Sequence, residues 1–420
     1  MHDPAQKLHV AENIPSYDVD KIRNDFPILY REVNNKPLVY LDNAASAQKP
    51  ACVIEAMDYA LRFEYANVHR GIHYLSNTAT QRFEDTRETC RRFLNARHAD
   101  EIIFTKNATE AVNLIAHTWG MDNIQQGDEI ILSIMEHHAN IVPWHFLRER
   151  KEAVLKWAPI GADGAFLLDE FEKLITPRTK MIALTHMSNV LGTIVPMEEV
   201  IKLARRHDIL VFVDAAQSTV HMDVDVQSLD ADFLMFSGHK VYGPSGIGVL
   251  YGKKEHLDKL PPFLGGGAMI ENVTTDKVTY GPPPTRFEAG TPPIVEAVGL
   301  TTALDYMMQI GRQAIADHEH ALTAYAHDQM SSLNWLKIYG TAPEKSGIVS
   351  FAIDGLHPHD ISMIVDRSGV AIRAGHLCTQ PLMQHYGVTA MCRASFGMYN
   401  TFKEVDVLVE ALKKAHDLFT

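Results

Sequence analysis

The sequence predicts an α/β protein in which a mostly parallel sheet is covered by helices, with a smaller region at the C-terminal end. Apolar runs of strand length alternate with helical stretches between residues 101 and 251. Continuous apolar strands that alternate with helices are typical of parallel sheets buried on both faces. At 420 residues, the chain also favours one large domain plus a smaller one over a single small core.

The alternation can be followed in order along the chain. Apolar stretches predict strands at 101–104, 129–133, 153–158, 179–185, 209–214, 233–236 and 247–251. Asn107 begins a capping sequence before a helix expected at 111–119, and another helix is expected at 197–207. Ligands of such sheets bind at the carboxyl ends of the strands. Asp214, Ser237 and the 107–110 turn are therefore expected at one edge of the sheet.

Beyond this sheet the pattern changes. Residues 261–293 are rich in Gly and Pro and predict a long irregular loop, which is usually functional or at an interface. A helix is expected at 294–308, and shorter strands at 348–353 and 370–373. We therefore expect an N-terminal arm and first helix at 1–35 that pack with the small domain. A large ligand-binding domain at 36–300 and a small C-terminal domain at 301–420 complete the division.

The composition limits which partners the protein is expected to bind and where in the cell it is expected to be. Acidic residues outnumber basic ones by 52 to 39, for a net charge of −13, which argues against nucleic acid or an anionic membrane as the main partner. No run of 18 uncharged apolar residues predicts a spanning helix. Residues 1–18 lack the features of a signal or transit peptide, so a cytoplasmic protein is expected. Four widely spaced cysteines without a C-x-x-C pair predict neither a disulfide framework nor a metal site.

Lys240 occupies an unusual place for a charged residue. It follows the apolar run 233–236 and lies between Ser-Gly-His and Gly-Pro-Ser-Gly turns. Lysine is seldom buried without a partner, so either its amine extends to water or it takes part in chemistry. Burial lowers the pKa of an amine and makes it nucleophilic. A buried lysine of this kind most often forms a Schiff base with pyridoxal 5'-phosphate.

That cofactor requires an acid for its pyridine nitrogen, a phosphate site and a group that stacks on its ring. Asp214 ends a strand and is a candidate acid, with Gln217 one turn further on for the ring oxygen. A helix beginning at 107–110 offers free N–H groups for a phosphate, and His137 or His138 offers an imidazole. Each feature alone has a structural alternative, such as a capping aspartate or a histidine pair without a catalytic role.

The sequence also contains a series of longer motifs. These are YLDNAASAQKP, NVHRGIHYLS, MEHHANIVPW, HMSNVLGT, VDAAQS, FSGHKVYGPSGIGVL, RFEAGTP, RAGHLC and CRASFGMYNT. Together, over roughly residues 20 to 420, they closely resemble the SUF-type (group II, SufS-like) cysteine desulfurases of the class V aminotransferase family. The resemblance implies a fold-type I pyridoxal-phosphate enzyme with a seven-stranded sheet. It further implies conversion of L-cysteine to L-alanine, with the sulfur destined for iron–sulfur cluster assembly.

The resemblance implies roles residue by residue. Lys240 matches the lysine that binds the cofactor covalently, and His137 matches the imidazole that stacks on its ring. The expected cofactor contacts are Asp214, Gln217, Ala108, Thr109, Ser237 and His239, with Thr291 supplied by the second protomer of a homodimer with shared active sites. The expected substrate contacts are Arg393, Asn189, Arg373, His69 and Ala44. Considered without the resemblance, Arg393 is a polar residue before a strand, and most such arginines are solvated.

Cys378 is expected to be the second nucleophile. It lies in a loop with Arg373 and His376 close in sequence, and cationic neighbours favour the reactive thiolate. It matches the family cysteine that carries a persulfide, whereas the alternative is a small buried apolar residue. That alternative is kept for the other cysteines, Cys52, Cys90 and Cys392. The family often has a histidine directly before this cysteine, where this chain has Leu377, which puts the role of such a histidine in doubt.

The sulfur acceptor and the reaction leave alternatives open. The sequence HPHD at 357–360 resembles the group that uses a zinc-containing SufU-type acceptor, with His359 as the acceptor-related residue, and a SufE-type acceptor is the alternative. Selenocysteine lyase shares the fold, the cofactor and most of the site. A non-catalytic sulfur-relay scaffold is the rival from another class, and it would be favoured if Lys240, Asp214 or Cys378 were missing. All three are present.

Overall fold

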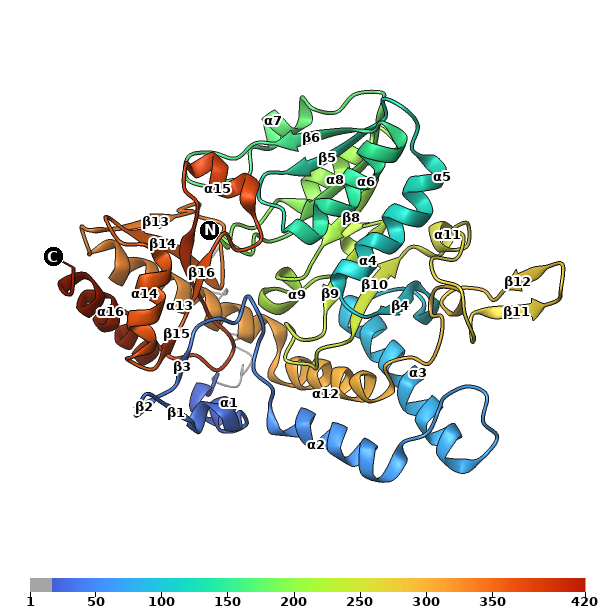
Figure 1. The fold of residues 1–420 in the computed structure, drawn as a ribbon, viewed down its shortest axis with the longest axis horizontal. Helices are drawn as coiled ribbons and strands as arrows, with labels where there is room; N and C mark the ends of the chain where they lie inside the picture. Colours follow the sequence, from blue (N-terminus) through green and yellow to red (C-terminus); the bar gives the residue numbers. More distant parts are fainter. Residues whose placement is uncertain (1–16, 420) are drawn as a thin grey trace, which may run out of the picture.

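A seven-stranded sheet forms the centre of the molecule in the computed structural model, which describes residues 17–419. Residues 1–16 of the expected N-terminal arm lie outside the described residues. The strand order is β4-β10-β9-β8-β7-β5-β6 (Figure 1). The strands are β4 (Ile102–Thr105), β5 (Glu129–Ser133), β6 (Val154–Ala158), β7 (Thr179–Thr185), β8 (Leu210–Asp214), β9 (Phe233–Ser237) and β10 (Gly248–Gly252).

The direction of the strands agrees with the predicted fold class. The pairs β5–β6, β5–β7, β7–β8 and β8–β9 are parallel, whereas β10 runs antiparallel to both of its neighbours, β9 and β4. All residues of β8 except Leu210, and all residues of β9, are buried, as expected for strands covered on both faces. The prediction of a mostly parallel α/β sheet is confirmed.

Helices cover both faces of this sheet. Successive side chains of a strand point to opposite faces, so the apolar side chains on each face pack against a different set of helices. Phe212 packs with α4 (Ala108–Ile115) and α6 (Val142–Lys151), whereas Val211 and Val213 belong to the core on the opposite face of the sheet. That other face is covered by α3 (Tyr74–Leu94), α8 (Met197–Arg205) and α12 (Ile294–Ile310). The helix expected at 111–119 begins three residues earlier, because the Asn107 side chain accepts a hydrogen bond from the N–H of Glu110 and caps α4.

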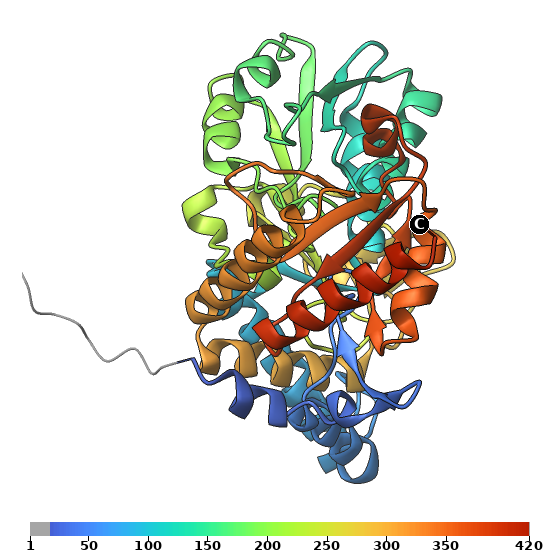
Figure 2. The same cartoon turned by 90° about the vertical axis from the view of Figure 1, so that its left-hand side faces the viewer.

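The C-terminal part contains a second sheet in the order β13-β14-β17-β16. Its elements are β13 (Leu336–Tyr339), β14 (Ile348–Ile353), β16 (Arg373–Gly375), β17 (Met391–Ser395), α13 (Arg312–Ser331), α14 (Pro358–Asp366) and α16 (Phe402–Asp417). The helices α13 and α16 lie side by side (Figure 2). The single strand expected at 370–373 is wrong, because β15 (Val370–Ala371) pairs with β3 (Val39–Tyr40) in a different sheet from β16.

Other connections bear on the sequence expectations. The loop expected to be irregular at 261–293 contains a hairpin, β11 (Ile270–Val273) and β12 (Val278–Tyr280), which projects from one end of the molecule (Figure 1). Arg23 of α1 (Val19–Asn24) forms an ion pair of 2.8 Å with Glu404 of α16. The division near residue 300 falls within α12 and stays a proposal.

The remaining α-helices and strands are short, apart from α2 (Ala51–Tyr59), which packs on α12. They are β1 (Glu32–Val33), β2 (Lys36–Pro37), α2, α5 (Met121–Asn123), α7 (Leu168–Glu172), α9 (Ser218–His221), α10 (Val226–Leu229), α11 (Lys254–Leu257) and α15 (Gln380–Tyr386). Within residues 17–419, no helix combines the length and apolar character needed to cross a membrane.

Candidate active site

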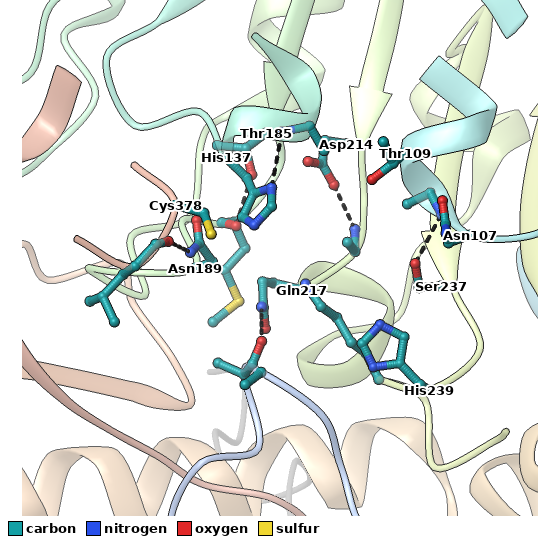
Figure 3. A pocket seen from close by; sticks show the side chains of 18 of the residues that line it. Asn107, Thr109, His137, Thr185, Asn189, Asp214, Gln217, Ser237, His239 and Cys378 are labelled. Carbon is teal, nitrogen blue, oxygen red and sulfur yellow. Dashed lines mark hydrogen bonds between the residues drawn. The ribbon is translucent and has the colours of Figure 1, made fainter. Parts of the chain in front are cut away.

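A cavity of about 380 Å³ opens where β8 and β9 end and α4 begins. The carboxyl ends of parallel strands are where such sheets bind ligands. Most of the predicted site residues line this one cavity: Ala44, Ala108, Thr109, His137, Asn189, Asp214, Gln217, Ser237, His239, Lys240, Arg373, Cys378 and Arg393. Figure 3 shows Cys378 and Asn189 on one side of it and Asn107, Thr109 and Ser237 on the other.

Lys240 and Asp214 are ionisable residues that line the cavity. Burial lowers the pKa of the Lys240 amine to about 8, although the nearby Asp214 carboxylate opposes the shift. Burial raises the pKa of Asp214, against the effects of the Ala216 N–H and of Lys240. The Ala216 N–H donates to Asp214 Oδ1 at 3.0 Å, which fixes the carboxyl group at the end of β8. The site therefore holds an amine of lowered pKa and a buried acid of raised pKa.

The start of α4 provides a place for an anion. The N–H of Ala108 donates to Ser237 Oγ at 2.9 Å, so the helix end and the end of β9 are held together. Gly248 permits this approach, because a side-chain carbon there would lie 2.5 Å from the backbone carbon of Asn107. Helix N-termini favour phosphate groups through their free N–H groups and dipole.

Gln217 and His137 are also held by the backbone. The Gln217 amide donates to the carbonyl oxygen of Ala44 at 2.9 Å, while its Oε1 is buried with no partner among the described residues. The N–H of Ala139 donates to His137 Nδ1 at 3.1 Å, and burial, followed by the charge of Lys240, lowers the pKa of His137 to about 3. A neutral imidazole and an unpaired buried acceptor, together with the acid and the helix end, fit pyridoxal phosphate.

Arg393 lies inside the protein, in β17, with only 3% of its surface exposed. Its Nη1 donates to the carbonyl oxygen of Asn189 at 2.8 Å and its Nη2 to Asp42 Oδ1 at 3.2 Å, while Nε is buried without a partner among residues 17–419. The ordinary expectation of a solvated arginine before a strand is wrong. The guanidinium group is fixed by two neighbours and keeps a donor for a ligand.

The loop that carries Cys378 turns back on itself beside the 137–140 turn. Leu377 and Cys378 both have left-handed backbone conformations, with φ of 53° and 56°. The His138 N–H donates to the carbonyl oxygen of Cys378 at 2.7 Å, and the Asn189 amide donates to that of Leu377 at 2.9 Å. These bonds hold the half-buried Cys378 thiol at the cavity that also contains Lys240.

Three predicted residues lie outside this cavity. Thr291 is exposed in the segment that directly precedes α12. His69 is exposed, has a left-handed φ of 71°, and its Nε2 lies 3.7 Å from Glu84 Oε1. His359 is exposed on α14. Their assigned roles stay predictions.

Asp42 is a site residue that the sequence argument missed. It contacts both arginines of the cavity, with Oδ2 lying 2.6 Å from Nη2 of Arg373 and Oδ1 lying 3.2 Å from Nη2 of Arg393. Its place in the YLDNAAS motif was the available signal, but no spacing rule connects it to residues more than 300 positions away.

Comparison with known proteins gives consistent matches over nearly the whole chain. The family described as Aminotransferase class-V matches residues 39–408. The chain is 50% identical over 404 residues to a cysteine desulfurase of Salmonella agona (strain SL483), covering 96% of this chain and 99% of the relative. It is 46% identical over 412 residues, or 98% of this chain, to a probable cysteine desulfurase of Mycolicibacterium paratuberculosis (strain ATCC BAA-968 / K-10), of whose length it spans 60%.

A solved structure gives the same result for the fold. The apo structure of the cysteine desulfurase from Thermococcus onnurineus NA1 matches with a TM-score of 0.90 and 38% sequence identity, covering 97% of this chain and 99% of the other.

Proposed function

The chain belongs to the aminotransferase class-V family, and from this premise we propose that it is a pyridoxal-phosphate-dependent cysteine desulfurase. In the proposed reaction, sulfur from L-cysteine is transferred to Cys378 and L-alanine is released. The observation that carries this proposal is that Lys240, Arg393 and Cys378 line one cavity. An amine, a carboxylate receptor and a thiol are the three groups that such a reaction requires.

Different residues of the cavity would hold different parts of the cofactor. The N-terminus of α4, with Thr109, Ser237 and His239, would hold the phosphate, while Asp214 and Gln217 would hold the ring nitrogen and ring oxygen. His137 would lie on the ring, and Lys240 would hold the cofactor covalently. When bound, pyridoxal phosphate withdraws electrons from the α-carbon of an amino acid.

We propose that Arg393 and Asn189 receive the substrate carboxylate. A guanidinium group binds a carboxylate through parallel N–H donors, and the unpaired buried Nε of Arg393 adds to this capacity. Arg373 lines the same cavity from its exposed edge. The amino acid would then lie with its carboxylate toward β17, in the cavity that Lys240 and Cys378 also line.

The reactive groups of the chain then act on the substrate in turn. Once the substrate amine has displaced it, the neutral amine of Lys240 accepts the proton from the α-carbon, which the lowered pKa permits near neutral pH. The Cys378 thiolate attacks the substrate sulfur, so that a sulfur–sulfur bond forms and the carbon–sulfur bond breaks. The electron pair of the broken bond stays with the carbon fragment, which is protonated and leaves as alanine.

The proposal extends to a homodimer with shared active sites. Large apolar side chains are exposed along α2, the turn that follows it and the start of α3: Ile54, Tyr59, Leu61, Phe63, Tyr65, Ile72, Tyr74 and Leu75. Exposed apolar surface of this extent is typical of protein interfaces. In the proposed dimer, a second copy that covers this surface would supply its own Thr291 to the neighbouring cavity.

We assign the chain to the SUF-type group and propose a SufU-type acceptor for the sulfur, for use in iron–sulfur cluster assembly. His359 supports this choice, because a side-chain carbon at Gly375 would lie 4.0 Å from its Nε2, and Gly375 is three residues before Cys378. An exposed imidazole at the base of the cysteine loop is suited to take a zinc ligand position. The cytoplasmic location stays a prediction.

The test combines the visible spectrum of the purified protein with its products from L-cysteine. We expect equal amounts of alanine and protein-bound persulfide, with mass spectrometry locating the persulfide on Cys378. Cys378→Ala should keep the cofactor spectrum and lose both products, whereas Cys52→Ser, at another half-buried cysteine, should retain them. Lys240→Ala should lose covalent attachment of the cofactor. Normal alanine production from L-cysteine by the Cys378→Ala variant would contradict the proposed reaction.

A further inference from the structure

Two histidines flank the thiol of Cys378. One ring nitrogen of His138, one of His376 and the sulfur of Cys378 all lie within 4.8 Å of one another. The two rings are tilted, with centroids 5.6 Å apart. His376 belongs to the cysteine loop, whereas His138 belongs to the turn on which that loop packs. Leu377, between His376 and the cysteine, is buried and offers no polar side chain.

The backbone determines where each imidazole carries its proton. The N–H of Gln380 donates to His138 Nε2 at 3.1 Å, and the N–H of Cys378 donates to His376 Nδ1 at 3.0 Å. A neutral imidazole has one accepting and one protonated ring nitrogen. Since the accepting nitrogen is used in both rings, Nδ1 of His138 and Nε2 of His376 are N–H donors.

These donors suit a negatively charged sulfur. We propose that His138 and His376 are a pair of N–H donors that stabilise the anionic sulfur carried by Cys378. The acceptor of these hydrogen bonds is the thiolate of Cys378 and, if the proposed desulfurase function holds, the terminal sulfur of its persulfide. Hydrogen bonds to a charged group favour the charged form and are stronger than those between neutral groups.

The surroundings keep one of the two rings in the required form. Burial, and then the proximity of His376, lower the pKa of His138, so that ring stays neutral with a defined tautomer. Other titratable or charged groups also face the cavity of Cys378: His137, Asp214, His239, Lys240, Arg373 and Arg393. Because these groups are unchanged when either histidine is replaced, a difference between variants isolates the contribution of the pair.

The test measures alkylation of Cys378 by iodoacetamide in the holoenzyme, followed by mass spectrometry of the Cys378 peptide. The variants are His138→Ala and His376→Asn; the shorter asparagine retains an acceptor for the Cys378 N–H but lacks the distant N–H. At about pH 7 we expect alkylation to slow by about five- to tenfold in each variant. At about pH 10, where accessible thiols are ionised, the rates should equal that of the parent. His376→Gln, whose longer side chain can carry its amide N–H to the position of the distant imidazole N–H, should recover much of the rate at pH 7.

The control is His320→Ala, at an exposed histidine of α13, which should alkylate as the parent does at both pH values. Equal slowing at pH 7 and pH 10 would overturn the proposal, because it would indicate altered access to the loop and not altered ionisation. Unchanged rates at both pH values would overturn it as well. The assay contains neither L-cysteine nor an acceptor, so its outcome is independent of whether the desulfurase function itself fails.

Discussion

Asp42 and Arg393 are joined inside the protein, with Asp42 Oδ1 3.2 Å from Nη2 of the guanidinium group. Burial lowers the pKa of Arg393, but the neighbouring carboxylate opposes this and keeps the charge in place. The same carboxylate contacts Arg373 at 2.6 Å. A single acid thus orients both arginines of the cavity, and two guanidinium groups against one carboxylate leave this group of three with a net positive charge.

This arrangement predicts the effect of replacing the buried arginine. Arg393→Lys keeps the charge but loses the fork that contacts Asp42 and Asn189, so the KM for L-cysteine should rise at least about tenfold, with a smaller change in kcat. Steady-state alanine production measures both constants. The matched control is Arg373→Lys, whose half-exposed side chain predicts a smaller rise. An unchanged KM in Arg393→Lys would exclude this residue as the carboxylate receptor.

The pKa of Lys240 predicts how cofactor uptake depends on pH. Only the neutral amine attacks the aldehyde of pyridoxal phosphate, and burial lowers this pKa to about 8. The uptake rate of the apoenzyme should therefore rise with pH through about 8 and level off above it, by about tenfold between pH 7 and pH 9. Stopped-flow absorbance measures this rate.

A second lysine and the nearby acid provide controls for that profile. Burial also lowers the pKa of Lys49 to about 8, but its Nζ donates to the carbonyl oxygen of His239 at 3.0 Å. Lys49→Gln should leave the midpoint in place. Asp214→Asn should move it to lower pH, because a negative charge that favours the ammonium form is removed. A profile without a midpoint near pH 8 in the parent would contradict the assignment.

Gly248 packs closely against the start of α4, which we propose to hold the cofactor phosphate, so a larger residue at position 248 should weaken cofactor binding. In Gly248→Ala, the added carbon would meet the backbone of Asn107 at 2.5 Å and push α4 away from β10. We expect about tenfold weaker cofactor binding and a lower Tm, as for other overpacked sites. Fluorescence titration of the apoenzyme and thermal unfolding measure the two effects. Gly267→Ala, which meets nothing within 4 Å, should match the parent in both.

Replacing His359 should affect stimulation by the acceptor but not the reaction that proceeds without an acceptor. His359→Ala should produce alanine at the parent rate without an acceptor, because the residue lies outside the cavity. Stimulation by a purified SufU-type protein should fall by about tenfold, because the variant lacks the imidazole that we propose as a ligand for the acceptor's zinc. His385→Ala, at an exposed histidine of α15, serves as the control. Full stimulation of the His359→Ala variant would leave the acceptor unassigned.

The sequence by itself determined the sheet and one edge of the site. Strands such as β8 and β9 were predictable because continuous apolar runs mark them locally. Asp214 is the last residue of β8 and Lys240 lies three residues after the end of β9, and parallel strands end at a common edge. The predicted start of α4 was three residues too late. The prediction treated the whole 107–110 turn as the cap, whereas the side chain of Asn107 alone caps the helix, which begins at Ala108.

Only the tertiary structure decided which distant residues meet. Arg393 was indistinguishable from a solvated arginine until β17 placed it against Asp42 and Asn189. His138 could not be separated from His137 by its sequence neighbours. In the fold, His137 lines the cavity, whereas His138 holds the Cys378 loop. Local patterns record strand ends and caps, but contacts between segments hundreds of residues apart depend on how the chain packs, and no spacing along the sequence specifies them.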